Sequence, residues 1–381
     1  MKRHGQLLAR IAEPANLRLA FWKAAKGKRA KPDCRAFQHG IDANLAELHG
    51  QLLSGHVPVG DYRTFIVHDP KERTICAAAF RERVLHHALM NVCEPVLERA
   101  AIFDSYACRK GKGQRAAVRR AESYARQHDW FLKMDVRKYF DSINQRVLLA
   151  LLARKFKDAA VLDVFEKILA SYETKPGCGL PIGNLTSQHF ANFYLAPLDR
   201  FLKEHLGCRA YVRYMDDFVV WGDSGAELRA VWREVEAFMT AELRLTLKPN
   251  VAVNKTAFGM DFLGYRIFPR ELRLARRSKL RFASKFRRYE QAWAEGRWTE
   301  WQLQQRMQAL LAFTLPARSR NWRLHVETRF GVVARRLEPH DPRGQLEQQR
   351  DQLPVGEPQQ QQPGQQEQQY WVPRGSGPSS A

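Results

Sequence analysis

Apolar residues recur along the chain with a helical period in some segments and in strand-like runs elsewhere. In the first 60 residues, one apolar face at helical spacing is formed by Ile41, Leu45, Leu48, Leu52 and Leu53. Short runs rich in β-branched and aromatic residues predict strands at 62–67, 73–77, 130–136, 209–213, 218–221 and 262–267. Amphipathic helices are predicted between them at 80–99, 114–127, 146–156, 158–172, 189–202 and 226–243. A capping-box pattern at Ser142–Gln145 predicts where the third of these helices begins.

The ends of the chain differ from this middle part. Residues 1–60 are basic and predicted to be helical, and residues 271–340 are predicted to be helical and are rich in arginine with interleaved aromatic residues. From about residue 341 the sequence is rich in Gln, Pro and Gly, and we expect it to be disordered. A chain of 381 residues exceeds what one hydrophobic core usually serves, so we expect two or three subdomains.

The charge of the chain narrows its possible partners. With 62 basic and 40 acidic residues, the formal net charge is +22. Such a basic globular chain favours a polyanion, above all a nucleic acid. No apolar run approaches transmembrane length, so we expect no membrane partner. The six cysteines are scattered without a Cys-x-x-Cys pair, which indicates reduced thiols in a cytoplasmic protein.

Acidic residues mark the ends of two predicted strands. Tyr214-Met215-Asp216-Asp217 lies between strands 209–213 and 218–221, which predicts a tight hairpin with two adjacent carboxylates. Two such carboxylates repel one another unless a cation neutralises them, although a solvated acidic turn is the simpler explanation. Asp135 ends the apolar strand that begins at Trp130, where a carboxylate also requires a metal or a base.

Two further segments have the composition of phosphate or nucleotide sites. The hairpin predicted over 62–77 brings Lys71 and Arg73 close together, and such a pair either holds phosphate or is an ordinary surface pair. The glycine- and proline-rich loop at 175–188 opens the helix predicted from His189. Glycines at the start of a helix let a nucleotide or a template base approach the backbone closely.

The order of Asp135, the glycine loop and the aspartate pair resembles the palm of a reverse transcriptase. The resemblance covers roughly residues 60–270 and includes several motifs in register. It implies an α+β right-hand polymerase fold. In that fold, residues 1–60 form a helical basic N-terminal extension, 61–127 the fingers and 128–270 the palm, with a fingers insertion around 142–188. Residues 271–340 form an α-helical thumb, and 341–381 a disordered tail.

The resemblance also implies roles for individual residues. Asp135 and Asp216 bridge two Mg²⁺ ions, Asp217 is a less direct partner, and the Val136 carbonyl joins one metal. Phe140 stands at the position of a steric gate against the ribose 2′-hydroxyl, although an ordinary core Phe fits the same position. The incoming dNTP is contacted by Lys71, Arg73, Phe140, Ile182, Gly183, Tyr214 and Met215. Template and primer are contacted by Ser187, Gln188, Lys255, Leu263 and Gly264.

The glycine loop indicates a subfamily. Retroviral, intron and retron enzymes typically have Gln-Gly and Ser-Pro where this chain has Ile182-Gly183 and Ser187-Gln188. The run from Ile182 to Gln188 resembles that of diversity-generating retroelement reverse transcriptases. Such bacterial or phage-encoded enzymes copy a template-repeat RNA into cDNA with misincorporation opposite adenines, together with a pentameric accessory variability determinant protein. An isoleucine beside the nascent base pair removes a polar contact that checks geometry, consistent with low fidelity.

Two alternatives stay open at this point. One is a retron-like or abortive-infection reverse transcriptase that serves phage defence, against which the Ser187-Gln188 ending of the loop argues. The other is a nucleic-acid-binding protein with a degenerate, inactive palm, against which the three intact aspartates argue. We expect no RNase H, zinc endonuclease or integrase-like domain after the palm.

Overall fold

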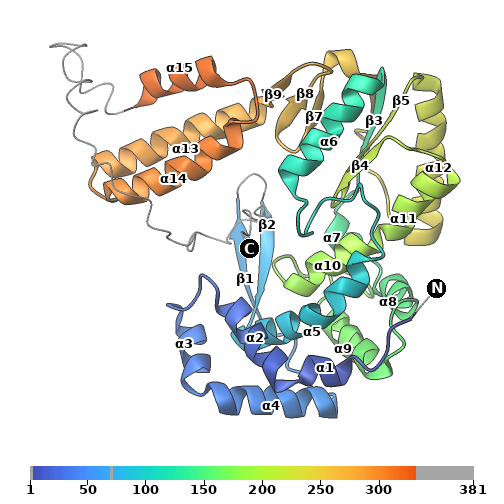
Figure 1. The fold of residues 1–381 in the computed structure, drawn as a ribbon, viewed down its shortest axis with the longest axis vertical. Helices are drawn as coiled ribbons and strands as arrows, with labels where there is room; N and C mark the ends of the chain where they lie inside the picture. Colours follow the sequence, from blue (N-terminus) through green and yellow to red (C-terminus); the bar gives the residue numbers. More distant parts are fainter. Residues whose placement is uncertain (1–2, 69–71, 332–381) are drawn as a thin grey trace, which may run out of the picture. The chain divides into compact units, whose positions relative to one another are not determined.

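The structure is a computed structural model that describes residues 3–68 and 72–331 of the chain. It divides into two compact units (Figure 1). The described part of the first unit comprises residues 3–68, 72–117 and 130–254. That of the second comprises residues 118–129 and 255–331, and the expected disordered tail from residue 341 lies outside the described residues.

The first unit begins with a helical cluster, as the apolar spacing predicts. It consists of α1 (Leu8–Ala12), α2 (Pro14–Ala25), α3 (Pro32–His39) and α4 (Ile41–Ser54). Helices α1, α2 and α3 pack on the long α5 (Phe80–Glu98), and α4 packs on α1, α2 and α3. The rings of Phe21, Phe37 and Phe80 lie within 6.0 Å of one another at the centre of this contact. Burial of three aromatic rings in one place stabilises the junction of α2, α3 and α5.

A two-stranded hairpin connects α4 to α5. Strand β1 (Tyr62–Val67) pairs antiparallel with β2 (Arg73–Ala78), in the register Tyr62 opposite Ala78 and Val67 opposite Arg73. Most of β1 is exposed, whereas Cys76 and Ala78 of β2 are buried. The hairpin is therefore attached to the rest of the unit at its base, through the buried end of β2 and through Tyr62 of β1, whose hydroxyl is hydrogen-bonded to the Ser171 hydroxyl at 2.7 Å.

The first unit also contains a four-stranded sheet with the order β4-β5-β3-β6, of which Figure 1 labels β3, β4 and β5. Its strands are β3 (Trp130–Asp135), β4 (Tyr211–Tyr214), β5 (Asp217–Gly222) and β6 (Ala252–Lys255). Strand β5 pairs antiparallel with both β3 and β4. The helix α12 (Gly225–Leu243) packs against β3 and β5, where Gly225 permits close contact because a Cβ there would lie 2.9 Å from the Trp130 ring.

One further helix precedes β3 in the sequence, and several short helices follow it. They are α6 (Gln114–Gln127), α7 (Tyr139–Ser142), α8 (Gln145–Ala153), α9 (Ala159–Ala170), α10 (Leu185–Tyr194), α11 (Ala196–Arg200) and a π-helical turn (Phe201–His205). The capping-box prediction was wrong, because Ser142 is the last residue of α7. Asn144 caps α8 instead, and its side chain accepts a hydrogen bond from the Val147 N–H at 3.0 Å. The helix predicted from His189 begins earlier, at Leu185.

The second unit contains a small sheet and a helical bundle (Figure 1). After a 3₁₀ turn (Thr256–Phe258), strands β7 (Met260–Phe262), β8 (Tyr265–Ile267) and β9 (Leu272–Leu274) form an antiparallel meander. Helices α13 (Arg276–Ala294), α14 (Glu300–Thr314) and α15 (Arg320–Phe330) follow. Phe282, Phe286 and Val326 form the buried centre of this bundle.

The α+β fold class is confirmed. All six cysteines are free thiols. Among the described residues, every helix is too short or too polar to cross a membrane. The division into fingers, palm and thumb stays a prediction, because the two compact units do not follow those boundaries.

Candidate active site

Three aspartates meet at one end of the four-stranded sheet. Asp135 ends β3 and stands directly opposite Asp217, the first residue of β5. Asp216 precedes it in the turn that joins β4 to β5, and its carbonyl accepts a hydrogen bond from the Val136 N–H at 3.4 Å. The order of two strands and a tight turn thus brings together carboxylates that are 81 positions apart in the sequence. The predicted hairpin and its acidic tip are present.

Burial and mutual repulsion both act on these carboxylates. Burial, and then the charge of Asp135, raises the pKa of Asp216 to about 7. Burial also raises the pKa of Asp217 to about 6, although the Lys133 ammonium opposes that rise. Neighbouring carboxylates with raised pKa values indicate a place where negative charge is concentrated and a cation is favoured. A solvated acidic turn would keep ordinary pKa values.

Two lysines already face the aspartates. Lys248 Nζ lies 2.5 Å from Asp135 Oδ2, and the Lys248 backbone N–H donates to the Asp135 carbonyl at 2.8 Å. Lys133 Nζ lies 3.2 Å from Asp217 Oδ1. Both pairs are partly exposed, so each contributes little to stability. Sequence reasoning missed both lysines, although Lys133 lies two residues before Asp135 and therefore on the same face of β3.

The residue types at this site fit a divalent cation. Asp135 Oδ1 is buried and accepts no hydrogen bond from the described residues. Carboxylate and carbonyl oxygens are the ligands that Mg²⁺ prefers, so Asp135, Asp216, Asp217 and the Val136 carbonyl would hold it. Within residues 3–68 and 72–331, no three His, Cys, Asp or Glu side chains are already arranged around one point. Two of the candidate ligands are paired with lysines instead, Asp135 with Lys248 and Asp217 with Lys133.

The glycine loop is joined to the β1–β2 hairpin by backbone contacts. The Ile182 carbonyl accepts a hydrogen bond from the Cys76 N–H of β2 at 2.7 Å. Gly183 has φ +118°, and a Cβ at this position would lie 2.9 Å from Ile75 Cγ2 and 3.1 Å from the Cys76 carbonyl. Only glycine therefore permits this approach. The contact places the loop beside the strand that begins with the exposed Arg73.

Phe140 lies at the same loop. Its carbonyl accepts a hydrogen bond from the Leu180 N–H at 2.9 Å. The ring is half-buried and meets the Tyr139 ring edge-on, with 5.8 Å between centroids. A half-buried ring retains a surface that a substrate can contact, unlike the fully packed ring of a core phenylalanine.

The other predicted site residues are more dispersed. Tyr214 and Met215 lie in the aspartate hairpin with buried side chains. Ser187 is also buried, and Gln188 Oε1 lies 3.6 Å from Cys108 Sγ, which donates to it. Lys71 lies outside the described residues.

Three of the predicted template and primer residues belong to the second unit. Lys255 is the last residue of β6 and is exposed. Leu263 and Gly264 form the turn between β7 and β8, with φ +48° and +86°. The Gly264 carbonyl accepts hydrogen bonds from the Ser278 hydroxyl at 2.7 Å and the Ala275 N–H at 3.1 Å. These contacts fix the turn to the start of α13.

A protein-family model matches the part of the chain that contains the candidate site. The family model for reverse transcriptase (RNA-dependent DNA polymerase) matches residues 68–267, more than half of the chain. That range includes the aspartates, the lysines that face them, Arg73 and the whole glycine loop.

Individual relatives are distant. The chain is 24% identical to protein YkfC of Escherichia coli over 62% of this chain and 74% of that protein. It is 26% identical to the group II intron-encoded protein LtrA of Lactococcus lactis over 35% of this chain, but spans only 23% of LtrA. Among solved structures, an apo telomerase from Candida tropicalis matches 61% of this chain and 53% of its own, with 11% identity and a TM-score of 0.45.

Proposed function

The chain belongs to the reverse transcriptase (RNA-dependent DNA polymerase) family, and from this premise we propose that Asp135, Asp216 and Asp217 are its catalytic residues. One observation supports this proposal above the others. Asp135 and Asp217 face each other across two paired strands, and the half-buried Asp216 lies in the turn beside them. No structural role requires three carboxylates at one sheet end, whereas transfer of a nucleotide to a primer does.

The residues around the aspartates have separate roles in this proposal. Two Mg²⁺ ions held there would favour deprotonation of the primer 3′-hydroxyl and neutralise charge on the transferred phosphate. Lys133 and Lys248 balance the carboxylate charge when the metal is not bound. Arg73, with Lys71, binds the triphosphate of the incoming dNTP, and the Phe140 ring stands against its sugar.

We propose further that the enzyme is a diversity-generating retroelement reverse transcriptase. Its template would be a template-repeat RNA, its product an error-prone cDNA, and its partner the pentameric accessory variability determinant protein. The sequence from Ile182 to Gln188 supports this subfamily. The Ile182 carbonyl accepts a hydrogen bond from β2, which supports a fixed position for this residue, and its apolar side chain would offer no hydrogen bond to a neighbouring base pair.

The test is to sequence cDNA that the purified protein makes from a defined RNA template, with Mg²⁺ and all four dNTPs. The reaction is run with and without the accessory protein. Misincorporation concentrated opposite adenines supports the retroelement proposal. Accurate cDNA under both conditions favours the retron-like alternative, and no cDNA under either condition contradicts the polymerase proposal itself.

Replacement of Ile182 by glutamine is expected to reduce misincorporation opposite template adenines. The amide restores a polar contact that penalises a mispaired base, and the expected reduction is about 3- to 10-fold, comparable to one hydrogen bond. Error rates at each template base are read from cDNA sequences. Ile182→Leu is the matched control, because it remains apolar and should keep the original error spectrum. An unchanged spectrum for Ile182→Gln would show that this side chain does not set fidelity.

Replacement of Gly183 by alanine is expected to raise the KM for dNTP by about tenfold, since the new methyl group pushes β2 away from the loop. The measurement is steady-state primer extension at varied dNTP. Gly177→Ala is the control, because Gly177 also has positive φ (+68°) but has no neighbouring atom within 4 Å of a built Cβ. Equal effects of the two substitutions would assign the result to backbone strain rather than to the loop–strand contact.

A further inference from the structure

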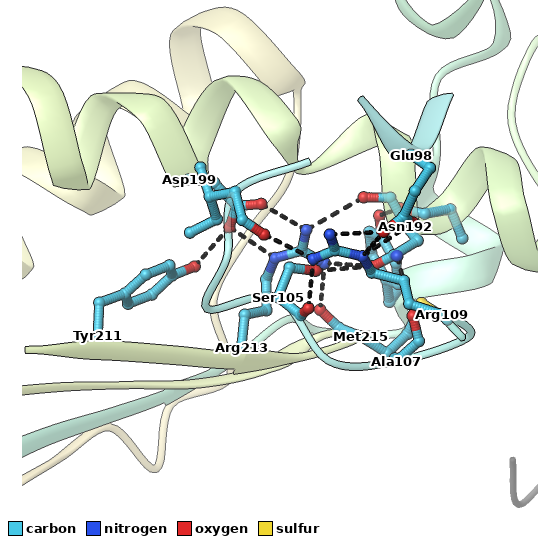
Figure 2. A network of polar contacts seen from close by, with 12 residues as sticks. Glu98, Ser105, Ala107, Arg109, Asn192, Asp199, Tyr211, Arg213 and Met215 are labelled. Atoms are coloured by element: carbon cyan, nitrogen blue, oxygen red, sulfur yellow. Dashed lines mark hydrogen bonds and ion pairs between the residues drawn. The ribbon is translucent and has the colours of Figure 1, made fainter. Parts of the chain in front are cut away.

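A buried arginine contacts the turn formed by Met215 and Asp216, which we call the catalytic turn. Arg213 belongs to β4, and its side chain is 1% exposed, as inaccessible as that of its partner Asp199 on α11. Arg213 Nε donates to Asp199 Oδ1 at 2.7 Å, and Nη2 donates to Asp199 Oδ2 at 2.5 Å. Figure 2 shows the guanidinium between Asp199 on one side and Asn192 on the other. A bidentate pair of this kind has a fixed geometry as well as a strong attraction.

The same guanidinium also holds the catalytic turn. Arg213 Nη1 donates to the Met215 carbonyl at 3.0 Å. This carbonyl belongs to the peptide group that joins Met215 to Asp216. Met215 itself has φ +57°, a left-handed conformation that is unfavourable for a residue with a side chain. Surrounding contacts must therefore hold the turn in this shape.

Asn192 of α10 completes the set of contacts. Its side-chain oxygen accepts from Arg213 Nη1 at 2.9 Å, and its backbone carbonyl accepts from Nη2 at 3.2 Å. Together with Asp199 and Met215, these acceptors take all five N–H donors of the guanidinium. Asn192 Nδ2 in turn donates to the Ala107 carbonyl at 3.0 Å. The turn is thus connected through Arg213 to two helices and a loop (Figure 2).

Stability alone is a weak explanation for this arrangement. Removal of two charges from water costs about as much as the pair gains, and apolar residues of similar volume often stabilise a protein equally well. An apolar side chain could fill the space of Arg213, but it could not bond the Met215 carbonyl. What the arginine adds over an apolar residue is a defined position for the turn.

We propose that Arg213 is a positioning residue for catalysis, which holds the Met215–Asp216 peptide so that Asp216 and Asp217 are set in place before metal and nucleotide arrive. This inference rests on the proposed function of the aspartates. Asp199 and Asn192 fix the guanidinium, and the guanidinium fixes the turn. Arg213 itself touches no reacting group.

The test compares Arg213→Lys with Tyr211→Phe. Lysine keeps a positive charge beside Asp199 but has three donors on one atom, so it cannot reach Asp199, Asn192 and Met215 together. Tyr211 donates its hydroxyl to Asp199 Oδ1 at 2.8 Å, so Tyr211→Phe removes a bond from the same carboxylate without contacting the turn. Amide hydrogen exchange of residues 214–217 is measured in the metal-free protein. Primer extension is measured over a Mg²⁺ titration, and binding to a primer–template duplex separately.

We expect Arg213→Lys to speed exchange at the turn by about tenfold, the scale of one charged hydrogen bond. We expect kcat to fall about 10- to 100-fold and the half-saturating Mg²⁺ concentration to rise, because misplaced ligands bind and act less well. Duplex binding should stay unchanged. Tyr211→Phe should lower the melting temperature without altering turn exchange, kcat or the Mg²⁺ requirement. Wild-type exchange, kcat and Mg²⁺ dependence in a folded Arg213→Lys protein would overturn the proposal.

If Arg213→Lys does not fold, the double variant Asp199→Leu with Arg213→Met is used instead. It removes both buried charges and fills their space with apolar side chains. Folded protein with a mobile turn and low kcat supports the positioning role, and folded protein with full activity contradicts it. The exchange measurement requires no catalysis. It therefore tests the role of Arg213 in the turn even if the wild-type protein extends no primer. Absence of primer extension by the wild type would contradict the proposed function and not the role of Arg213.

Discussion

Replacement of Asp216 by asparagine is expected to abolish primer extension on an RNA template, with a loss of at least about 10³-fold. Asparagine has nearly the same shape but lacks the negative charge that a divalent ion requires. Because burial and the Asp135 charge raise the pKa of Asp216, the substitution also removes a repulsion from the metal-free protein. The melting temperature should accordingly stay equal or rise. Extension of a labelled primer with Mg²⁺ and dNTP measures the activity.

Asp223→Asn is the matched control, since Asp223 is an exposed carboxylate just beyond the other end of β5. It should extend primers like the wild type. Binding of Asp216→Asn to RNA should be nearly intact, because the basic surface of the chain is unchanged. Full residual activity of Asp216→Asn would refute the assignment of the metal site.

Replacement of Phe140 by alanine is expected to admit ribonucleotides. The half-buried ring stands beside the glycine loop, where it would clash with a ribose 2′-hydroxyl, and alanine removes that clash. We expect the preference for dNTP over rNTP, expressed as a ratio of kcat/KM values, to fall by about 10²-fold. Single-nucleotide extension with each substrate class measures the ratio.

Phe140→Tyr keeps the ring and should keep the preference for dNTP. A core role for Phe140 gives a different result. In that case Phe140→Ala would lower the melting temperature and leave the ratio of kcat/KM values unchanged. The two measurements together separate a steric gate from an ordinary packing residue.

The strands and the three aspartates were predictable because their signals are local. Runs of β-branched and aromatic residues mark β3, β4 and β5, and each carboxylate interrupts or ends such a run. Helix positions were also predictable, but their ends were less so. Ser142 has the better capping pattern, yet it ends α7 and its hydroxyl donates to the Arg137 carbonyl, which leaves Asn144 as the cap.

The contacts that organise the site depend on long-range pairing, and no local pattern indicates them. Lys248 reaches Asp135 only because the segment after α12 returns to the end of β3. Arg213 looks like one more basic residue of a chain with net charge +22, and its burial against Asp199 depends on a contact between α11 and β4 that no local pattern marks. The short strand β9 was likewise missed, because three residues carry too weak a periodic signal.

The saturated guanidinium of Arg213 has a consequence for how this sequence can vary. Every N–H already has an acceptor, so a substitution at position 213 leaves Asp199 as an unpaired buried charge, and a substitution at 199 does the same to Arg213. Either single change is costly, whereas the joint change to apolar residues is much less so. Relatives that polymerise are therefore expected to keep both residues, and relatives that have lost the activity are expected to lose both together, even though both lie away from the reacting groups.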